Sequence, residues 1–537
     1  MKKKKEAVAK VGDLKEGQMK GVTVGETKVL LSRLDGNLHA IAATCSHYGG
    51  PLDEGALSGR TIVCPWHNAA FDITSGHLER PPAMNDLSAY EIGVEEGDIF
   101  VTLPEKPEES RCPSMVKKNV RADRRNFIIL GAGAAGAVAV ETLRHVGFQG
   151  SITMVTPEFH LPYDRTTLSK GYLAGNQGKN DLPLRSEGFY REHGVDLLLG
   201  RKAVGLKAQE KTIELDDGKT LSFDACLIAT GGVARTLGIP GDDLENVTTL
   251  RSFSDAERII DATQGARRAV VIGESFIGME TAASLRARGL EVTIVGRLRV
   301  PFQRTLGEDI GRMLQGEHQK NGVTFELNTS PARFEGDERV ASVILENGKR
   351  LLADLVVVGV GVTPVTDFIQ GITLGRDGSV PVDDHLLAAE GIYAAGDIAR
   401  FPYRKTGDQI RIEHWVLAEQ QGRVAAINMA GKDARYDLVP FFWTVQYEVY
   451  LMVTGFAGKW DEIITMGDVD AKDFLAFYVK DGRVTAAAGV GHDRDIAAIS
   501  ELFRHDRMPE PDSLRSNPPD FPTLLSSLSN SSENLSP

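Results

Sequence analysis

Cysteine is scarce in this sequence, with four residues in 537. So sparse a set does not form the disulfide framework of a small secreted domain, which makes the reducing cytoplasm the expected compartment. Long apolar runs are missing too, because no stretch of eighteen or more apolar residues occurs that could form a membrane-spanning helix. The amino-terminal lysines are not followed by an apolar segment, so this start is not typical of a secretory signal.

A surplus of basic residues is likewise absent. Asp and Glu outnumber Lys and Arg by 74 to 61, which gives a formal net charge of -13. Nucleic-acid surfaces need clustered Lys and Arg, so we expect no nucleic-acid partner. A hydrophobic content of 42% is typical of globular proteins, and 537 residues exceed one ordinary domain. The chain is therefore expected to be a multidomain protein without a nucleic-acid or membrane partner.

Two of the four cysteines lie close together, and each has a histidine just behind it. The pairs are Cys45-x-His47 and Cys64-x-x-His67, with sixteen residues between them. They lie in a segment, residues 7–104, that alternates short apolar runs with Gly and Asp-Gly turns, which predicts an all-β domain. Two thiolates and two imidazoles at this spacing fit either a structural zinc ion or a Rieske [2Fe–2S] centre.

A buried strand, a glycine turn and a helix are predicted at NFIILGAGAAG, after a Pro-rich and charged linker. Glycines at these positions permit a tight turn, and the helix N-terminus attracts a pyrophosphate. The next strand ends at Glu158, 22 residues past the last glycine, where a carboxylate can accept from the ribose hydroxyls. The candidate contacts of this first dinucleotide site are Gly131, Gly133, Ala134, Ala135 and Gly136.

A second unit of the same kind is VVIGESFIGME. Gly273 and Gly278 hold its outer positions, but Ser275 stands in the middle, where its side chain would crowd the pyrophosphate. After the next strand comes Arg297 rather than an acid. An Arg there could meet a 2′-phosphate or could simply be solvated, so the choice between NADH and NADPH stays open. Two such units predict two nucleotide-binding domains.

The order of the motifs resembles that of FAD-dependent pyridine nucleotide reductases. The matching stretches are HLPYDRTTLSK, ATGG, GESFIGME, AAGDIARF and EHWVLAEQQG. With the C-x-H and C-P-x-H pairs, the chain is most similar to the Rieske-bearing branch of the apoptosis-inducing factor-like proteins, and next to the ferredoxin reductases of bacterial ring-hydroxylating dioxygenase systems. The resemblance covers residues 7–510 and implies FAD, a Rieske-type [2Fe–2S] cluster, and NADH or NADPH as co-substrate.

The resemblance also implies a role for each ligand of the cluster. Cys45 and Cys64 would hold the buried iron, and His47 and His67 the outer iron, with solvent-facing rings through which electrons leave. The sequence departs from the family pattern at Asn68, where Gly is common. Neither loop carries the extra cysteine of respiratory Rieske proteins, so a low-potential, ferredoxin-type cluster is expected.

The same resemblance places Arg165 and Lys170 along the flavin. Lys170 would lie near the isoalloxazine N5 and pair with Glu280, which makes these two the catalytic candidates. Asp397 would hydrogen-bond a ribityl hydroxyl. The other cofactor contacts expected from the matching motifs are Thr230, Gly231, Gly361, Glu413, His414 and Trp415.

The expected fold is multidomain. An all-β Rieske domain precedes an α/β core with two dinucleotide-binding domains of the glutathione-reductase type, and a small α+β domain follows. The predicted boundaries are 1–106 for the Rieske domain, 107–124 for the linker, 125–247 and 369–436 for the two parts of the FAD-binding domain, 248–368 for the NAD(P)-binding domain, 437–515 for the carboxy-terminal domain and 516–537 for a disordered tail.

Disulfide reductases of this superfamily carry a redox cysteine pair after the first FAD helix, and residues 164–172 contain no cysteine. Cys112 and Cys226 are expected to be inert. The expected function is electron transfer from NAD(P)H through FAD to the Rieske cluster and on to an unidentified acceptor, either a small molecule or a redox protein. The alternatives are the reductase arm of an oxygenase system and an NAD(P)H-responsive signalling protein with little turnover. A homodimer is compatible with either.

Overall fold

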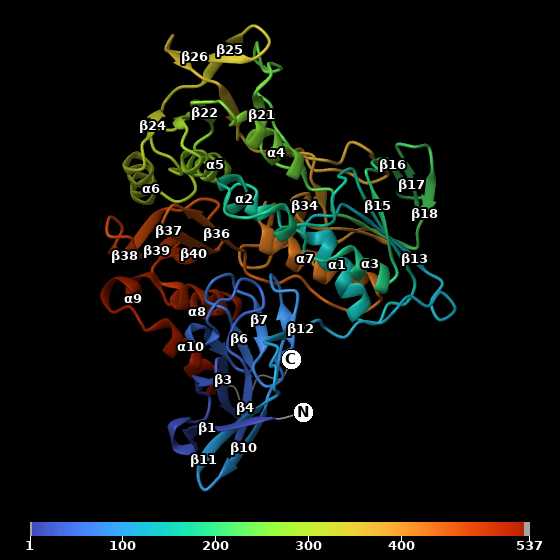
Figure 1. Ribbon diagram of the computed structural model, residues 1–537, viewed down its shortest axis with the longest axis vertical. Coiled ribbons are helices and arrows are strands. Elements are labelled where there is room, and N and C mark those ends of the chain that lie inside the picture. The colour runs from blue at the N-terminus through green and yellow to red at the C-terminus, as the bar shows by residue number, and fades with distance from the viewer. Residues whose placement is uncertain (1–2, 531–537) are drawn as a thin grey trace.

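A computed structural model describes residues 3–530. Figure 1 shows the amino-terminal β domain at one end of the molecule and the α/β core at the other, with the carboxy-terminal sheet packed between them on one side. The expected order of an all-β domain, a two-domain α/β core and a small α+β domain is confirmed. Within residues 3–530, no helix has both the length and the apolar character needed to cross a membrane.

The amino-terminal domain consists of three small antiparallel sheets. Leu30, Ile41 and Phe71 are fully buried among them. One cysteine–histidine loop lies between β4 and β5, and the other between β6 and β7. The strands are β1 (Lys4–Lys10), β11 (Asp98–Leu103) and β10 (Glu91–Glu95) in the first sheet, β2 (Met19–Val24), β3 (Thr27–Leu34) and β4 (Asn37–Ala42) in the second, and β5 (Ala56–Ser58), β6 (Thr61–Val63), β7 (Ala70–Asp72) and β8 (Leu78–Arg80) in the third.

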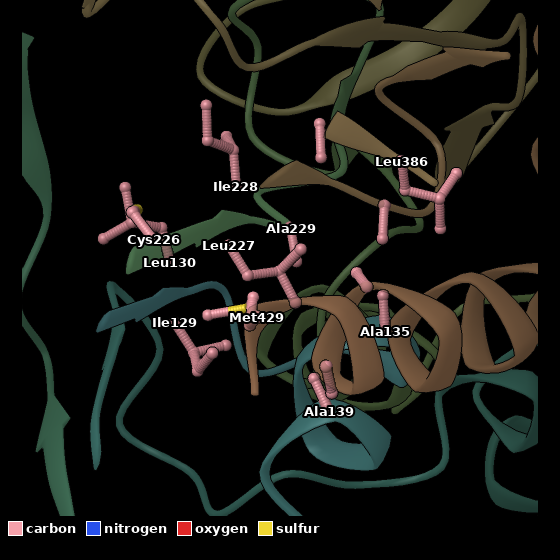
Figure 2. Packing of buried hydrophobic residues seen from close by; sticks show 14 of the residues in the cluster. Ile129, Leu130, Ala135, Ala139, Cys226, Leu227, Ile228, Ala229, Leu386 and Met429 are labelled. Atoms are coloured by element: carbon pink, nitrogen blue, oxygen red, sulfur yellow. The ribbon is translucent and has the colours of Figure 1, made fainter. Parts of the chain in front are cut away.

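The first α/β domain has a sheet of six strands in the order β15-β14-β13-β19-β33-β32, parallel except at β32. Figure 2 shows part of its core, where Ile129 and Leu227 of the strands lie beside Met429 of α7, with Ala135 and Ala139 of α1 in the same cluster. The elements are β13 (Asn126–Leu130), α1 (Ala134–His145), β14 (Ser151–Thr156), β15 (Val195–Leu199), β19 (Ala225–Ile228), β32 (Leu387–Ala389), β33 (Ile392–Ala394) and α7 (Trp415–Met429).

The second α/β domain repeats this plan with five parallel strands in the order β21-β28-β22-β23-β24. The central strands AVVI and LVVV are apolar along their length because both faces of a parallel sheet are covered. The elements are β21 (Val247–Thr249), α4 (Phe253–Ala262), β22 (Arg268–Ile272), α5 (Phe276–Ala287), β23 (Glu291–Val295), α6 (Glu308–Lys320), β24 (Val323–Glu326) and β28 (Leu355–Val358).

Shorter elements complete the core. They are β9 (Asp86–Leu87), β12 (Ser110–Arg111), α2 (Gly171–Ala174), α3 (Glu187–Glu192), β16 (Ala203–Lys207), β17 (Thr212–Leu215), β18 (Thr220–Ser222), β20 (Gly232–Ala234), β25 (Pro331–Gly336), β26 (Val340–Leu345), β27 (Arg350–Leu352), β29 (Val362–Pro364), β30 (Ile369–Gln370), β31 (Val380–Pro381), β34 (Ala399–Tyr403) and β35 (Asp408–Ile410). The pair β9–β12 ties the predicted linker to the β domain.

The carboxy-terminal domain is a five-stranded antiparallel sheet in the order β36-β37-β40-β39-β38. It is followed by three helices. The elements are β36 (Phe441–Gln446), β37 (Val449–Gly455), β38 (Glu462–Asp468), β39 (Asp473–Lys480), β40 (Arg483–Val490), α8 (Asp493–Arg504), α9 (Pro511–Ser516) and α10 (Phe521–Asn530).

The prediction of a disordered tail from residue 516 is wrong for α10. Phe521 and Leu525, one helical turn apart, are 2% and 1% exposed, and the Phe521 ring lies 5.6 Å from that of Phe477. The serine-rich composition hid this apolar stripe, which packs against the domain core. The remainder of the predicted tail, residues 531–537, lies outside the described residues.

The β domain is docked against the rest of the chain by polar and apolar contacts. Helices α8 and α10 both pack on β5. Arg80 of β8 forms an ion pair with Glu501 of α8 at 2.7 Å, and the Glu501 side chain is only 1% exposed. On the other side, Arg185 donates to the backbone carbonyl oxygen of Met84 at 2.8 Å. These contacts fix which face of the β domain meets the reductase core.

Candidate redox sites

The four predicted ligands lie together at the tips of the two loops. Cys45 and Cys64 are buried, and a hydrogen bond between their thiols lowers the pKa of Cys64. His47 and His67 face each other with their Nδ1 atoms 3.2 Å apart. Burial lowers the pKa of His47 to about 4, so its ring is neutral and able to ligate a metal. The structure thus forms one sulfur pair and one nitrogen pair.

This division into pairs separates the two metal hypotheses. A tetrahedral zinc ion with bonds of about 2.0–2.3 Å would hold its four ligand atoms at roughly 3.5 Å from one another. Among the described residues, no three of these four ligand atoms lie within 4.8 Å of one another. A Rieske centre needs two cysteines on one iron and two histidines on the other. The arrangement fits the two-iron centre and does not fit zinc.

The loops also have the shape that a cluster requires. A Cβ atom at Gly50 would lie 2.7 Å from the Cys64 sulfur, so a side chain there would displace a ligand. Asn68 has a φ of 60°, in the left-handed region that Gly adopts freely and Asn adopts more readily than other residues. The departure from Gly at this position is therefore compatible with the loop.

The expectation of solvent-facing histidines is wrong for His67, whereas His47 is only partly buried. His67 is 4% exposed; its Nε2 hydrogen-bonds with the Tyr450 hydroxyl, and its ring lies 4.2 Å from that of Trp443. The His47 ring stacks on Tyr48 at 4.1 Å, and the Tyr48 hydroxyl donates to Asp164. Tyr450 and Trp443 belong to the carboxy-terminal domain. The histidine edge thus faces the reductase part of the chain, because the β domain docks with this edge inward.

The first glycine turn has the geometry that a dinucleotide needs. Gly131 has a φ of 112°, and a Cβ there would lie 2.1 Å from the Ala229 carbonyl oxygen. Gly136 approaches the Gly131 carbonyl so closely that a Cβ would lie 2.0 Å from its oxygen. In front of Gly133, no heavy atom of the described residues lies within 4 Å of a Cβ position. This leaves room for a pyrophosphate at the N-terminus of α1, where Ala134 begins the helix.

The other predicted FAD contacts lie at the same edge of the sheet, past the ends of β14, β19 and β33. Glu158 forms an ion pair with Arg165 at 2.6 Å and accepts from the Tyr163 hydroxyl. Asp397 pairs with Arg251 at 2.6 Å. Beyond β19 follow Thr230, Gly231 and the ribbon of β20. Carboxyl ends of parallel strands form the usual ligand edge of such sheets, so their placement fits a bound FAD.

Lys170 and Glu280 meet as expected, at 2.8 Å. Glu280 is 3% exposed and also accepts from the hydroxyls of Ser169 at 2.5 Å and Thr444 at 2.7 Å. Thr444, in β36, in turn accepts from the Gln446 amide at 3.1 Å. The carboxylate is therefore held by donors from two domains other than its own, and Lys170 is the half-buried member of the pair.

The residues before α7 were also predicted as cofactor contacts. His414 is the N-cap of the helix, and its ring stacks on Phe442 at 4.3 Å. Burial lowers the pKa of His414 to about 4. Trp415 is half-buried at the first helical position, whereas Glu413 is exposed and pairs with Arg411 at 2.7 Å. His414 and Trp415 are thus partly buried, and Glu413 lies at the surface.

The second glycine turn repeats the close contacts of the first. Gly273 has a φ of 118°, and a Cβ at Gly278 would lie 2.0 Å from the Gly273 carbonyl oxygen. Ser275 is the exposed N-cap of α5, and Gly361 follows β28 at the same edge. Arg297 is exposed just past β23. These residues therefore lie around one edge of the second sheet.

Sequence reasoning missed several residues of these sites. Tyr450 and Thr444 lie in a domain whose contacts with the ligands have no local signal. Glu274, between Gly273 and Ser275, accepts from the backbone N–H groups of Arg297 and Leu298. The only feature of the sequence that could have pointed to Glu274 is the presence of an acidic residue inside the glycine turn.

The remaining cysteines stand apart from both sites. Burial raises the pKa of the Cys226 thiol, which lies fully inside β19, and the pKa of the exposed Cys112 thiol in the linker is raised as well. A raised pKa lowers the thiolate fraction and with it the reactivity.

Two glycine-turn domains around a Lys–Glu ion pair, joined to a cysteine–histidine β domain, define a flavin- and pyridine-nucleotide-dependent oxidoreductase. Residues 125–422 match the family model of the pyridine nucleotide-disulphide oxidoreductases, residues 4–91 the Rieske [2Fe–2S] domain, and residues 441–525 the reductase C-terminal domain. The chain belongs to the pyridine nucleotide-disulphide oxidoreductase family. It is an NAD(P)H-dependent oxidoreductase with FAD and a [2Fe–2S] cluster as cofactors, which confirms the prediction.

The relatives cover most of the chain. Human apoptosis-inducing factor 3 is 36% identical over 512 residues, 93% of this chain and 84% of the relative. The ferredoxin reductase component of chlorobenzene dioxygenase from Cupriavidus sp. (strain PS12) is 36% identical over 384 residues, 71% of this chain and 93% of its own. The crystal structure of the ferredoxin reductase for the CYP199A2 system from Rhodopseudomonas palustris matches with a TM-score of 0.71 and 29% identity, covering 75% of this chain and all of the other.

Proposed function

We propose that this chain transfers electrons from NAD(P)H through FAD to its own Rieske-type cluster and from there to an external acceptor. When bound, FAD exchanges a hydride with the nicotinamide and releases single electrons, which the cluster carries one at a time. Lys170, held by Glu280, places a positive charge where negative charge would develop on the flavin.

One observation carries this proposal. Trp443 and Thr444 are neighbours in β36, and successive side chains of a strand point to opposite faces. Trp443 lies 4.2 Å from the His67 ring, and Thr444 donates to Glu280 at 2.7 Å. A single strand thus separates the histidine edge from the Lys170–Glu280 pair, an arrangement that supports direct transfer within one chain.

The test is anaerobic titration of the holoprotein with NADH and with NADPH, followed by optical and EPR spectra. We expect the flavin to bleach first and the Rieske EPR signal to appear next. His67→Ala should abolish that signal and leave the FAD spectrum intact. A cluster that stays oxidised beside a fully reduced flavin would overturn the proposal. A long-lived reduced complex with negligible turnover would favour an NAD(P)H-responsive signalling protein instead.

A second candidate is the reductase arm of an oxygenase system, which the ferredoxin reductase component of chlorobenzene dioxygenase favours. In that case the acceptor is an oxygenase or a separate ferredoxin. Adding a purified bacterial [2Fe–2S] ferredoxin to the NADH-reduced holoprotein separates the cases. Reduction that persists in the His67→Ala variant would mean that the flavin serves the ferredoxin directly, without the chain's own cluster.

A further inference from the structure

The end of β23 has a carboxylate that does not come from β23. Gly296, the first residue past the strand, is buried, and a Cβ there would lie 2.7 Å from both Cδ and Oε2 of Glu274. The Glu274 side chain crosses over from the glycine turn that precedes α5. It therefore fills the volume that a side chain at 296 would occupy, so the glycine at 296 and the glutamate at 274 are complementary.

The carboxylate is fixed in that place by the backbone. Its Oε1 accepts from the N–H groups of Arg297 at 3.1 Å and Leu298 at 3.0 Å. Within residues 3–530, no hydrogen-bond donor reaches Oε2. One oxygen is thus held by the loop, and the other is available to a ligand at the carboxyl end of the strand.

In a dinucleotide fold, the adenosine ribose lies at the end of the second strand, where an acid accepts from the 2′-hydroxyl of NAD and an arginine meets the 2′-phosphate of NADP. We propose that Glu274 supplies this acid from the glycine turn and selects NADH over NADPH. A 2′-phosphate would meet a like charge and would find the N–H groups of Arg297 and Leu298 already occupied. Arg297 is exposed, and its nearby charge is the opposing influence.

The inference rests on the proposed function only for its kinetic test, since binding tests it separately. We expect kcat/KM for flavin reduction to be at least about 100-fold higher with NADH than with NADPH. Glu274→Ala and the isosteric Glu274→Gln should lower this ratio by about tenfold or more. The matched control is Glu291→Gln, which removes an exposed acid at the opposite end of β23 and should leave the ratio unchanged.

Calorimetric titration of the holoprotein with NAD⁺ and NADP⁺ gives the same comparison without turnover. Circular dichroism and flavin absorbance confirm that each variant is folded and loaded. Stronger binding of NADP⁺ than of NAD⁺ by the wild type would overturn the proposal, as would a ratio that Glu274→Ala leaves unchanged. If binding follows the expected order but no flavin is reduced, the proposed function fails and the nucleotide preference stands.

Discussion

The ion pair between Arg80 and Glu501 allows a direct test of how the Rieske domain docks on the rest of the chain. It joins β8 to α8 at 2.7 Å, with side chains 16% and 1% exposed. Burial would raise the pKa of Glu501, but the charges of Arg80 and Arg504 outweigh it and hold the pKa below its ordinary value. Glu501 is therefore ionised at neutral pH, and Glu501→Gln removes the charge while keeping the shape.

The expected cost follows from burial. Removing one partner of a buried ion pair leaves the other charge uncompensated, at a cost of about 3–5 kcal/mol, and the remaining exposure of Arg80 favours about 3. Because the two residues lie in different domains, the lost stabilisation lowers the free energy of docking between these domains. At 1.4 kcal/mol per tenfold, the ratio of undocked to docked molecules should rise about 100-fold. The double variant Arg80→Met/Glu501→Gln should recover most of the loss, since no buried charge is left unpaired.

Hydrogen–deuterium exchange measures this ratio directly. Residues 56–63 and 521–528 should exchange about 100-fold faster in Glu501→Gln, because their protection depends on docking. The matched control is Arg504→Ala, which removes a partner of the same carboxylate at 2.9 Å within α8 and crosses no domain boundary. Unchanged exchange in Glu501→Gln, or an equal increase in Arg504→Ala, would refute the assignment of this pair to docking.

Two further predictions concern the buried polar chain behind the Lys170–Glu280 pair. Thr444→Val removes a hydrogen-bond donor to the Glu280 carboxylate, so we expect flavin reduction by NADH to slow about tenfold in anaerobic stopped-flow measurements. The control Thr444→Ser keeps the hydroxyl and should react at nearly the wild-type rate. Equal rates in all three proteins would contradict a role of this hydrogen bond in flavin reduction. His318 donates to Gln446, and burial lowers its pKa from 6.5 to about 4, so the unfolded state binds the extra proton. Lowering the pH from 7 to 5 should then cost about 2 kcal/mol of unfolding free energy in urea titrations, and His318→Gln should remove that part of the fall.

Local spacing was enough to predict the metal loops and the two glycine turns. Each depends on residues that are neighbours in sequence, as with Cys64 and His67 or Gly131 and Gly136, and on backbone conformations that only certain residues adopt readily. Lys170 and Glu280 were paired across 110 residues only through the family resemblance. Chemistry carried by short motifs was therefore within reach of the sequence.

Contacts between domains could not be predicted from the sequence. Tyr450 meets His67 across 383 residues, and neither side chain carries a motif for the other. Trp443 packs against the rings of both histidine ligands, and no motif in the sequence indicates that contact. The solvent-facing histidines were predicted from the family resemblance alone. Burial of the edge is a property of docking, which depends on surface complementarity that no spacing reports.

The position of β36 gives the carboxy-terminal domain a role beyond support. Its alternating side chains serve both stations, Trp443 on the histidine edge and Thr444 on the Glu280 side. A shift of this strand would therefore disturb the charge pair and the cluster ligands together. The packing of the carboxy-terminal sheet against the histidine edge, which would favour transfer from flavin to cluster, also buries His67 away from any outside acceptor. An acceptor that must contact His67 would therefore need the β domain to undock.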